Sequence, residues 1–102
     1  MVKVSGSQEI TTTDETDLFV VPGNYIGYLR RLEIVNKSAS LATIQLKFYN
    51  GDVGKVVLNK AVAAGGTLVL AENELPTEGV PTKITVTSDS QPIRVDYSLD
   101  LR

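Results

Sequence analysis

Apolar and polar residues alternate through the middle and the last segment of this chain. Ile44, Leu46 and Phe48 are separated by single polar residues, which is the period of a β-strand with one buried face. Residues 29–49 predict two such strands joined by a short polar turn, and we interpret them as a central hairpin. Residues 93–102 alternate just as strictly, so a strand is expected there as well.

Shorter apolar segments, separated by Gly, Pro and Asn, occupy much of the remaining sequence. Further strands are predicted at residues 17–22, 25–35, 53–59, 67–70 and 83–87. The strand at 17–22 contains a continuous apolar run and is expected to be covered on both faces, and Asn50-Gly51 predicts a tight hairpin turn. We therefore predict an all-β fold, an antiparallel β-sandwich of seven or eight short strands of jelly-roll or Ig-like type, with no substantial helix.

The first residues are more polar than the rest of the chain. Residues 1–16 are predicted to be an N-terminal arm, partly extended, followed by a single β-sandwich domain at residues 17–102. Two interpretations of the arm stay open. It is either a loosely ordered terminus, or a segment whose Val2 and Val4 pair with the sheet edge of a neighbouring subunit.

Some apolar residues fall on the outward side of the predicted strands. Four of them alternate out of phase with the inward residues of their own strands, and this favours burial against another subunit. Arg30 interrupts the alternation, so a shift of register is expected there, and a bulge of this kind could return some of the four to the core. With the two valines of the arm, the predicted subunit or capsid interface consists of Val2, Val4, Leu29, Val35, Val57 and Val69.

The composition narrows the possible chemistry. The 102 residues include no cysteine and no histidine, which removes disulfides, thiolate catalysis and imidazole bases or ligands. There are 10 basic and 12 acidic residues without a basic cluster, so nucleic acid is not an expected partner. Long apolar runs are absent from the sequence, so neither a membrane span nor Sec export is expected. The glycosylation pattern Asn36-Lys37-Ser38 would matter only after export.

Two groups of carboxylates could form a metal site or a catalytic pair. Asp14, Glu15 and Asp17 could offer oxygen ligands to calcium, but their spacing does not match a full calcium-binding loop and favours a solvated acidic turn. Glu72 and Glu74 could flank a glycosidic bond, but the chain has no tryptophan to hold a sugar ring, so an exposed loop is favoured. We predict no catalytic residue, metal, cofactor or small-molecule substrate.

Several segments occur in an order that is found in a known group of proteins. They are Asp17-Leu18-Phe19-Val20-Val21-Pro22, Leu32-Glu33-Ile34-Val35-Asn36, Thr43-Ile44-Gln45-Leu46, Ala64-Gly65-Gly66-Thr67-Leu68-Val69-Leu70, Leu75, Gly79, Ile84-Thr85-Val86 and Ile93-Arg94-Val95. In these segments the chain resembles small β-sandwich virion structural proteins of tailed bacteriophages, over residues 17–98.

The resemblance implies a non-enzymatic structural protein of the virion, assembled in the host cytoplasm. The role that it favours is capsid decoration, in which the protein acts as cement between capsomers. A neck or tail-associated protein and a receptor- or carbohydrate-binding module at a tail tip are the alternatives. The implied partners are further copies of the chain, in a trimer or higher ring, and a major capsid or neck/tail protein.

Overall fold

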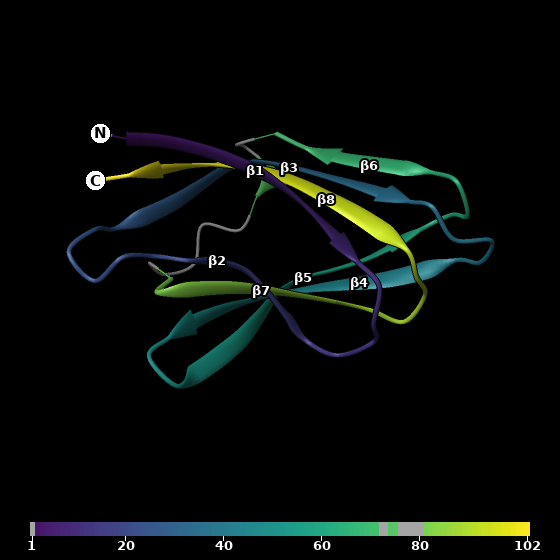
Figure 1. Ribbon diagram of the computed structural model, residues 1–102, viewed down its shortest axis with the longest axis horizontal. Helices are drawn as coiled ribbons and strands as arrows, with labels where there is room; N and C mark the ends of the chain where they lie inside the picture. Colours follow the sequence, from purple (N-terminus) through teal and green to yellow (C-terminus); the bar gives the residue numbers. More distant parts are fainter. Residues whose placement is uncertain (1, 72–73, 76–80) are drawn as a thin grey trace.

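The computed structural model describes residues 2–71, 74–75 and 81–102, and this part of the chain forms strands and no α-helix. The eight strands are β1 (Val2–Ile10), β2 (Thr16–Val20), β3 (Gly27–Asn36), β4 (Ala42–Asn50), β5 (Val53–Val62), β6 (Thr67–Leu70), β7 (Lys83–Ser88) and β8 (Ile93–Leu101). They form two four-stranded sheets, one above the other in Figure 1. The predicted all-β sandwich is confirmed.

The order of the strands is that of a jelly roll. The first sheet has the order β1-β8-β3-β6 and the second has the order β2-β7-β4-β5. The chain can be followed as one long hairpin in which β4 pairs with β5, β3 with β6, β2 with β7 and β1 with β8, all antiparallel. Rolling up this hairpin adds the pairs β3–β8 and β4–β7 and gives the two Greek keys of that fold. The two termini lie side by side at one end (Figure 1).

The predicted central hairpin is wrong, because β3 and β4 lie in different sheets. The residues between them cross from the first sheet to the second, and this crossing is held by Asn36, which is fully buried. Its side-chain amide donates to the carbonyl oxygens of Ser40 and Val62, and its Oδ1 accepts from Ser38. The glycosylation pattern that begins at Asn36 is therefore inaccessible in the folded chain.

Bulges explain where the alternation of the sequence breaks. In β3 the pairing with β8 skips Arg30, which confirms the predicted shift, and Leu29 is turned into the core. In β5 the pairing with β4 skips Val57, so Val56 is exposed and Val57 packs against the core. The cover expected on both faces of residues 17–22 is also wrong, because Val20 in β2 is 58% exposed.

The N-terminal segment forms part of the sandwich. β1 is an edge strand of the first sheet and pairs with β8 along its whole length, from Val2 opposite Leu101 to Ile10 opposite Ile93. An intramolecular strand thus occupies most of the segment that was expected to be a partly extended arm, because β8 offers it an edge of the same length. The folding of residues 17–102 as a separate domain stays a prediction.

The core lies between the two sheets and receives side chains from all eight strands. The predicted inward faces of β4 and β8 are confirmed, since Ile44, Leu46 and Val95 are fully buried. Burial of each such side chain stabilises the fold by about 1.5–3 kcal/mol. A hairpin turn does follow β4, but one residue later than predicted from Asn50-Gly51: Asn50 still belongs to β4 and pairs with Val53, so Gly51 and Asp52 form the tip.

Candidate assembly surfaces

Charged side chains cover the outer face of the first sheet. Glu33 on β3 lies 3.5 Å from Arg31 and 3.9 Å from Arg94, which also contacts Asp96 at 3.2 Å. A hydrogen bond from Ser7 lowers the pKa of Asp96, and this effect outweighs the opposing effect of desolvation. Exposed ion pairs contribute little to stability, but this network makes the centre of the face hydrophilic.

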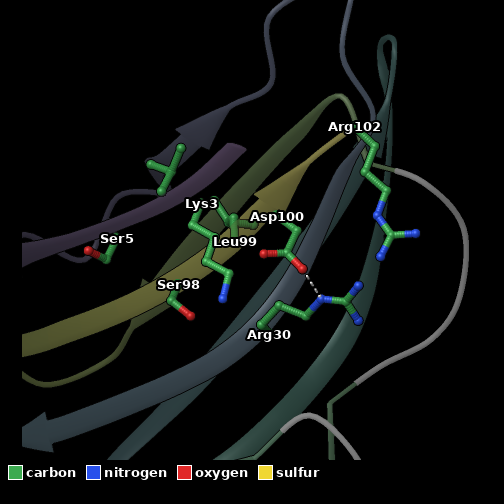
Figure 2. A pocket seen from close by; sticks show the side chains of 8 residues that line it. Lys3, Ser5, Arg30, Ser98, Leu99, Asp100 and Arg102 are labelled. Carbon is green, nitrogen blue, oxygen red and sulfur yellow. Dashed lines mark hydrogen bonds and ion pairs between the residues drawn. The ribbon is translucent and has the colours of Figure 1, made fainter. Parts of the chain in front are cut away.

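One end of this face is hollowed beside the two termini. The depression has a volume of about 560 Å³, and its lining includes Lys3, Ser5, Arg30, Asp100 and Arg102. Figure 2 shows Arg30 turned toward Asp100, with the guanidinium Nε donating to the carboxylate at 2.7 Å. The two best-shielded charges of the depression therefore neutralise each other. This contact is an ion pair at the surface of the sandwich.

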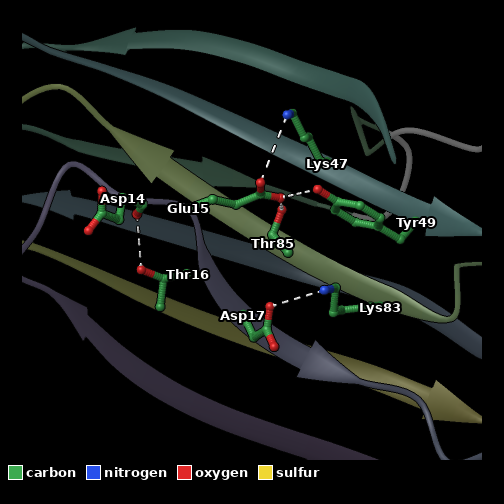
Figure 3. Close-up of polar contacts among 8 residues, drawn as sticks. All are labelled: Asp14, Glu15, Thr16, Asp17, Lys47, Tyr49, Lys83 and Thr85. Atoms are coloured by element: carbon green, nitrogen blue, oxygen red, sulfur yellow. Dashed lines mark hydrogen bonds and ion pairs between the residues drawn. The ribbon is translucent and has the colours of Figure 1, made fainter. Parts of the chain in front are cut away.

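A polar network centred on Glu15 covers the outer face of the second sheet. The Glu15 carboxylate accepts hydrogen bonds from the hydroxyl groups of Thr85 and Tyr49, and Lys47 lies 4.0 Å away (Figure 3). The bond from Thr85, followed by that from Tyr49, lowers the pKa of Glu15, and the bond to Glu15 raises the pKa of Tyr49. Because Glu15 immediately precedes β2, the network ties β2 to β7 and β4 across the face.

The carboxylates considered for a calcium site are engaged in other contacts, and the pair considered for catalysis lies partly outside the described residues. Glu15 accepts two hydroxyl hydrogen bonds, and Asp17 lies 3.5 Å from Lys83. Of the pair Glu72 and Glu74, the first lies outside the described residues. Within the described part of the chain, no three potential ligand side chains gather closely enough to hold a metal ion. The same part contains no helix with the length and apolar character needed to cross a bilayer.

Four of the predicted interface residues lie on β3, β5 and β6. The expected outward position of Leu29 is wrong, since this residue is 9% exposed and belongs to the core. Val57, the bulge residue of β5, also packs against the core. Val35 and Val69 face outward on neighbouring strands, where Val69 is exposed and Val35 half-buried. An interface role for these two stays a prediction.

Val2 and Val4 lie on β1, at the rim of the first sheet. They pair with Leu101 and Leu99 of their own chain, so β8 occupies one side of the strand. The other side of β1 is an open edge, because no further strand of the described chain pairs with it. A neighbouring subunit can therefore pair with β1 only from this open side.

Exposed apolar side chains gather at the edges and ends of the sandwich. In the described part of the chain, the large ones are Val2, Val20, Tyr25, Ile26, Leu41, Val53, Val56 and Val69. Five of these eight lie on the edge strands β1, β2, β5 and β6, and none lies on the central strands β3, β4, β7 and β8. Sequence reasoning missed most of them because alternation does not reveal which strands are edges. Both faces are hydrophilic at their centres, so the rim is the surface most suited to another protein.

The comparisons with known proteins relate this chain to others by fold. No family model matches the sequence, and no curated protein is significantly similar to it. The crystal structure of PirA is similar with a TM-score of 0.59 and 16% identity, over 92% of each chain. A protein of Bacillus endospore appendages, which form disulfide-linked pili, is similar with a TM-score of 0.54 and 11% identity, over 98% of this chain and 84% of that chain.

A weaker similarity extends to a virus. The VP2 subviral particle of infectious bursal disease virus gives a TM-score of 0.36 with 17% identity, over 98% of this chain but 32% of that chain. This TM-score is too low to support an inference. At the sequence identities of PirA and the appendage protein, their similarity to this chain shows a shared fold, and function must be argued from the surface.

Proposed function

We propose that this protein is a non-enzymatic structural subunit of a virion, and specifically a capsid decoration protein that acts as cement between capsomers. The observation that carries the proposal is the distribution of exposed apolar residues, which lie on edge strands and loops. An edge strand that joins another protein gains backbone hydrogen bonds and buries its apolar side chains together. The resemblance to small virion proteins of tailed bacteriophages supports the same role.

A protein of this kind acts by adding contacts to a shell. If it binds the assembled shell and not the dissociated capsomers, it stabilises the shell by RT ln(1 + [L]/Kd), which is about 2.7 kcal/mol at a concentration of 100 times Kd. The proposed partners are further copies of the chain, in a trimer or higher ring, and a major capsid protein. A neck or tail protein is the partner in the alternative role.

The fold also favours a second candidate, a subunit of a filament. The appendage protein with a TM-score of 0.54 comes from pili, so this fold is compatible with repeated head-to-tail contacts. Those pili are disulfide-linked, whereas this chain has no cysteine. A filament of this protein would therefore be held by noncovalent contacts at the edges and ends of the sandwich.

Cryo-electron microscopy of the native particles tests the proposed role. We expect many symmetric copies of the chain over the shell, with edge strands at the contacts. Purified protein added to shells that lack it should bind them and raise their melting temperature. Copies confined to the neck or tail would replace decoration by the alternative role. Copies confined to a tail tip, together with binding of the purified protein on a glycan array, would favour the receptor- or carbohydrate-binding module instead, whereas absence of the chain from the particles would overturn the virion role.

A further inference from the structure

The edge strand β1 is long, regular and open. It has nine residues and pairs with β8 without any register shift. The other three edge strands each have a feature that discourages further pairing, namely a bulge in β2 and in β5 and a length of four residues in β6. A regular edge without such a feature is a template for another strand.

The charges of β1 are complementary about its central residue, Gly6. If two copies of β1 pair antiparallel around Gly6, Lys3 of each copy stands opposite Glu9 of the other. The remaining opposite pairs are Val2 with Ile10, Val4 with Gln8 and Ser5 with Ser7. Every pair joins residues of the same parity, so each side chain stays on the face of the sheet that it already occupies. A shift by two residues in either direction removes both Lys3–Glu9 pairs.

The two charged residues of β1 are placed to meet a second copy. Lys3 and Glu9 are exposed and lie on the outer face of the sheet, opposite Asp100 and Arg94 of their own chain. Glu9 also lies 3.9 Å from Lys37, but its side chain is still 52% exposed. Opposite Cβ atoms of an antiparallel pair are about 4.5–5.5 Å apart, which is within reach of a Lys–Glu contact.

Gly6 suits the centre of such a pair. A Cβ atom at this position would lie 2.5 Å from the Tyr97 hydroxyl oxygen, because the Tyr97 ring covers the inner side of the glycine. Tyr97 in turn packs edge-on against Phe19, with ring centroids 6.1 Å apart. The chain's own ring thus fills the space on the inner face, and two copies of Gly6 can meet without side chains between them.

We propose that two copies of this chain pair through β1, as antiparallel strands centred on Gly6, and thereby join two four-stranded sheets into one continuous sheet. The contact uses the same surface on both copies, so it closes at a dimer and leaves the other edges of the sandwich for further contacts. The proposal rests on the structural role proposed above and deepens it by naming one contact between copies. A ring of more than two copies would need a second, different contact at another edge.

Charge exchange between the two strands tests this pairing. Sedimentation velocity between about 1 μM and about 1 mM should show a wild-type dimer. Lys3→Glu and Glu9→Lys each introduce two like-charge pairs into the dimer and should weaken it at least about tenfold. An equimolar mixture of the two variants should form a heterodimer, because each then meets opposite charges at both positions. If either substitution weakened the dimer by disturbing its own chain, mixing the two variants would not restore association. A heterodimer would therefore show that residue 3 of one copy lies opposite residue 9 of the other.

Lys60→Glu provides the matched control. It makes the same charge change on the exposed part of edge strand β5 and should leave the dimer unchanged. Thermal unfolding of each variant establishes that it is folded. The pairing is overturned if the wild type is monomeric at about 1 mM, if either β1 variant dimerises as the wild type does, or if the mixture gives no heterodimer. None of these results removes the virion role, which fails only if native particles lack the chain.

Discussion

The side-chain amide of Asn36, at the end of β3, donates a hydrogen bond of 2.9 Å to the backbone carbonyl oxygen of Val62, at the end of β5 in the opposite sheet. The same fully buried side chain accepts hydrogen bonds from the backbone N–H and the hydroxyl group of Ser38, at 2.9 and 2.6 Å. One residue therefore links the two sheets at the point where the chain crosses between them.

Replacement of Asn36 should destabilise the fold strongly. Asn36→Ala removes the donor that Ser40 and Val62 share, and we expect the free energy of unfolding to fall by about 2–4 kcal/mol in chemical denaturation. Asn36→Asp keeps the oxygen that accepts from Ser38 but loses the amide that donates to Ser40 and Val62, and it should destabilise the fold at least as much. Asn59→Ala, at an exposed position of β5, is the control. Wild-type stability of Asn36→Asp would show that the amide hydrogen bonds do not hold the crossing.

Leu29 and Val69 should respond very differently to truncation. Leu29→Ala leaves a cavity in the core and should lower the free energy of unfolding by about 2–4 kcal/mol. Val69→Ala shortens an exposed side chain on an edge strand and should change it by less than about 0.5 kcal/mol. Urea denaturation of both variants measures the difference. A Leu29→Ala variant as stable as the wild type would contradict the position of Leu29 in the core.

The turn between β4 and β5 should require glycine at position 51. Gly51 has a φ of +64°, which an L-residue with a Cβ atom adopts only at a cost. We therefore expect Gly51→Ala to lower the free energy of unfolding by about 1 kcal/mol. Gly23→Ala is the matched control, since a Cβ atom there meets nothing within 4 Å. Equal melting temperatures of the two variants would argue against strain at Gly51.

The fold should lose stability in acid through Glu15 and Asp96. Hydrogen bonds hold the pKa of these carboxyl groups below their usual values of 4.5 and 3.8. A lowered pKa in the folded state stabilises the protein above the usual value, and this contribution is lost as the pH falls through the folded-state pKa. Melting temperatures measured from about pH 7 down to about pH 2 should therefore fall below about pH 4.5.

Substitution of the two carboxyl groups separates their contributions. Glu15→Gln should reduce the fall in melting temperature that begins below the usual glutamate pKa of 4.5. Asp96→Asn should reduce the fall that begins at lower pH, below the usual aspartate pKa of 3.8. Asp52→Asn, in the β4–β5 turn away from both networks, controls for the loss of one negative charge. An unchanged pH profile in Glu15→Gln would mean that its hydrogen bonds to Tyr49 and Thr85 do not contribute to stability.

The sequence alone determined those features that depend on neighbouring residues. The alternation of β4 and β8 identified their buried faces, and the interruption at Arg30 identified a bulge. The dipeptide Asn50-Gly51 identified a hairpin turn to within one residue. Each of these features depends on a few consecutive residues, because backbone geometry sets the period of a strand and the conformation of a tight turn.

Only the tertiary structure decided which strands are neighbours. It placed β3 and β4 in different sheets, brought β1 beside β8 and left β1 at an edge with its charges open to a second copy. It also returned Leu29 and Val57 to the core or its margin. Strand pairing joins residues far apart in the chain, and alternation is the same in central and edge strands. The candidate assembly surface therefore depends on contacts that no local pattern specifies.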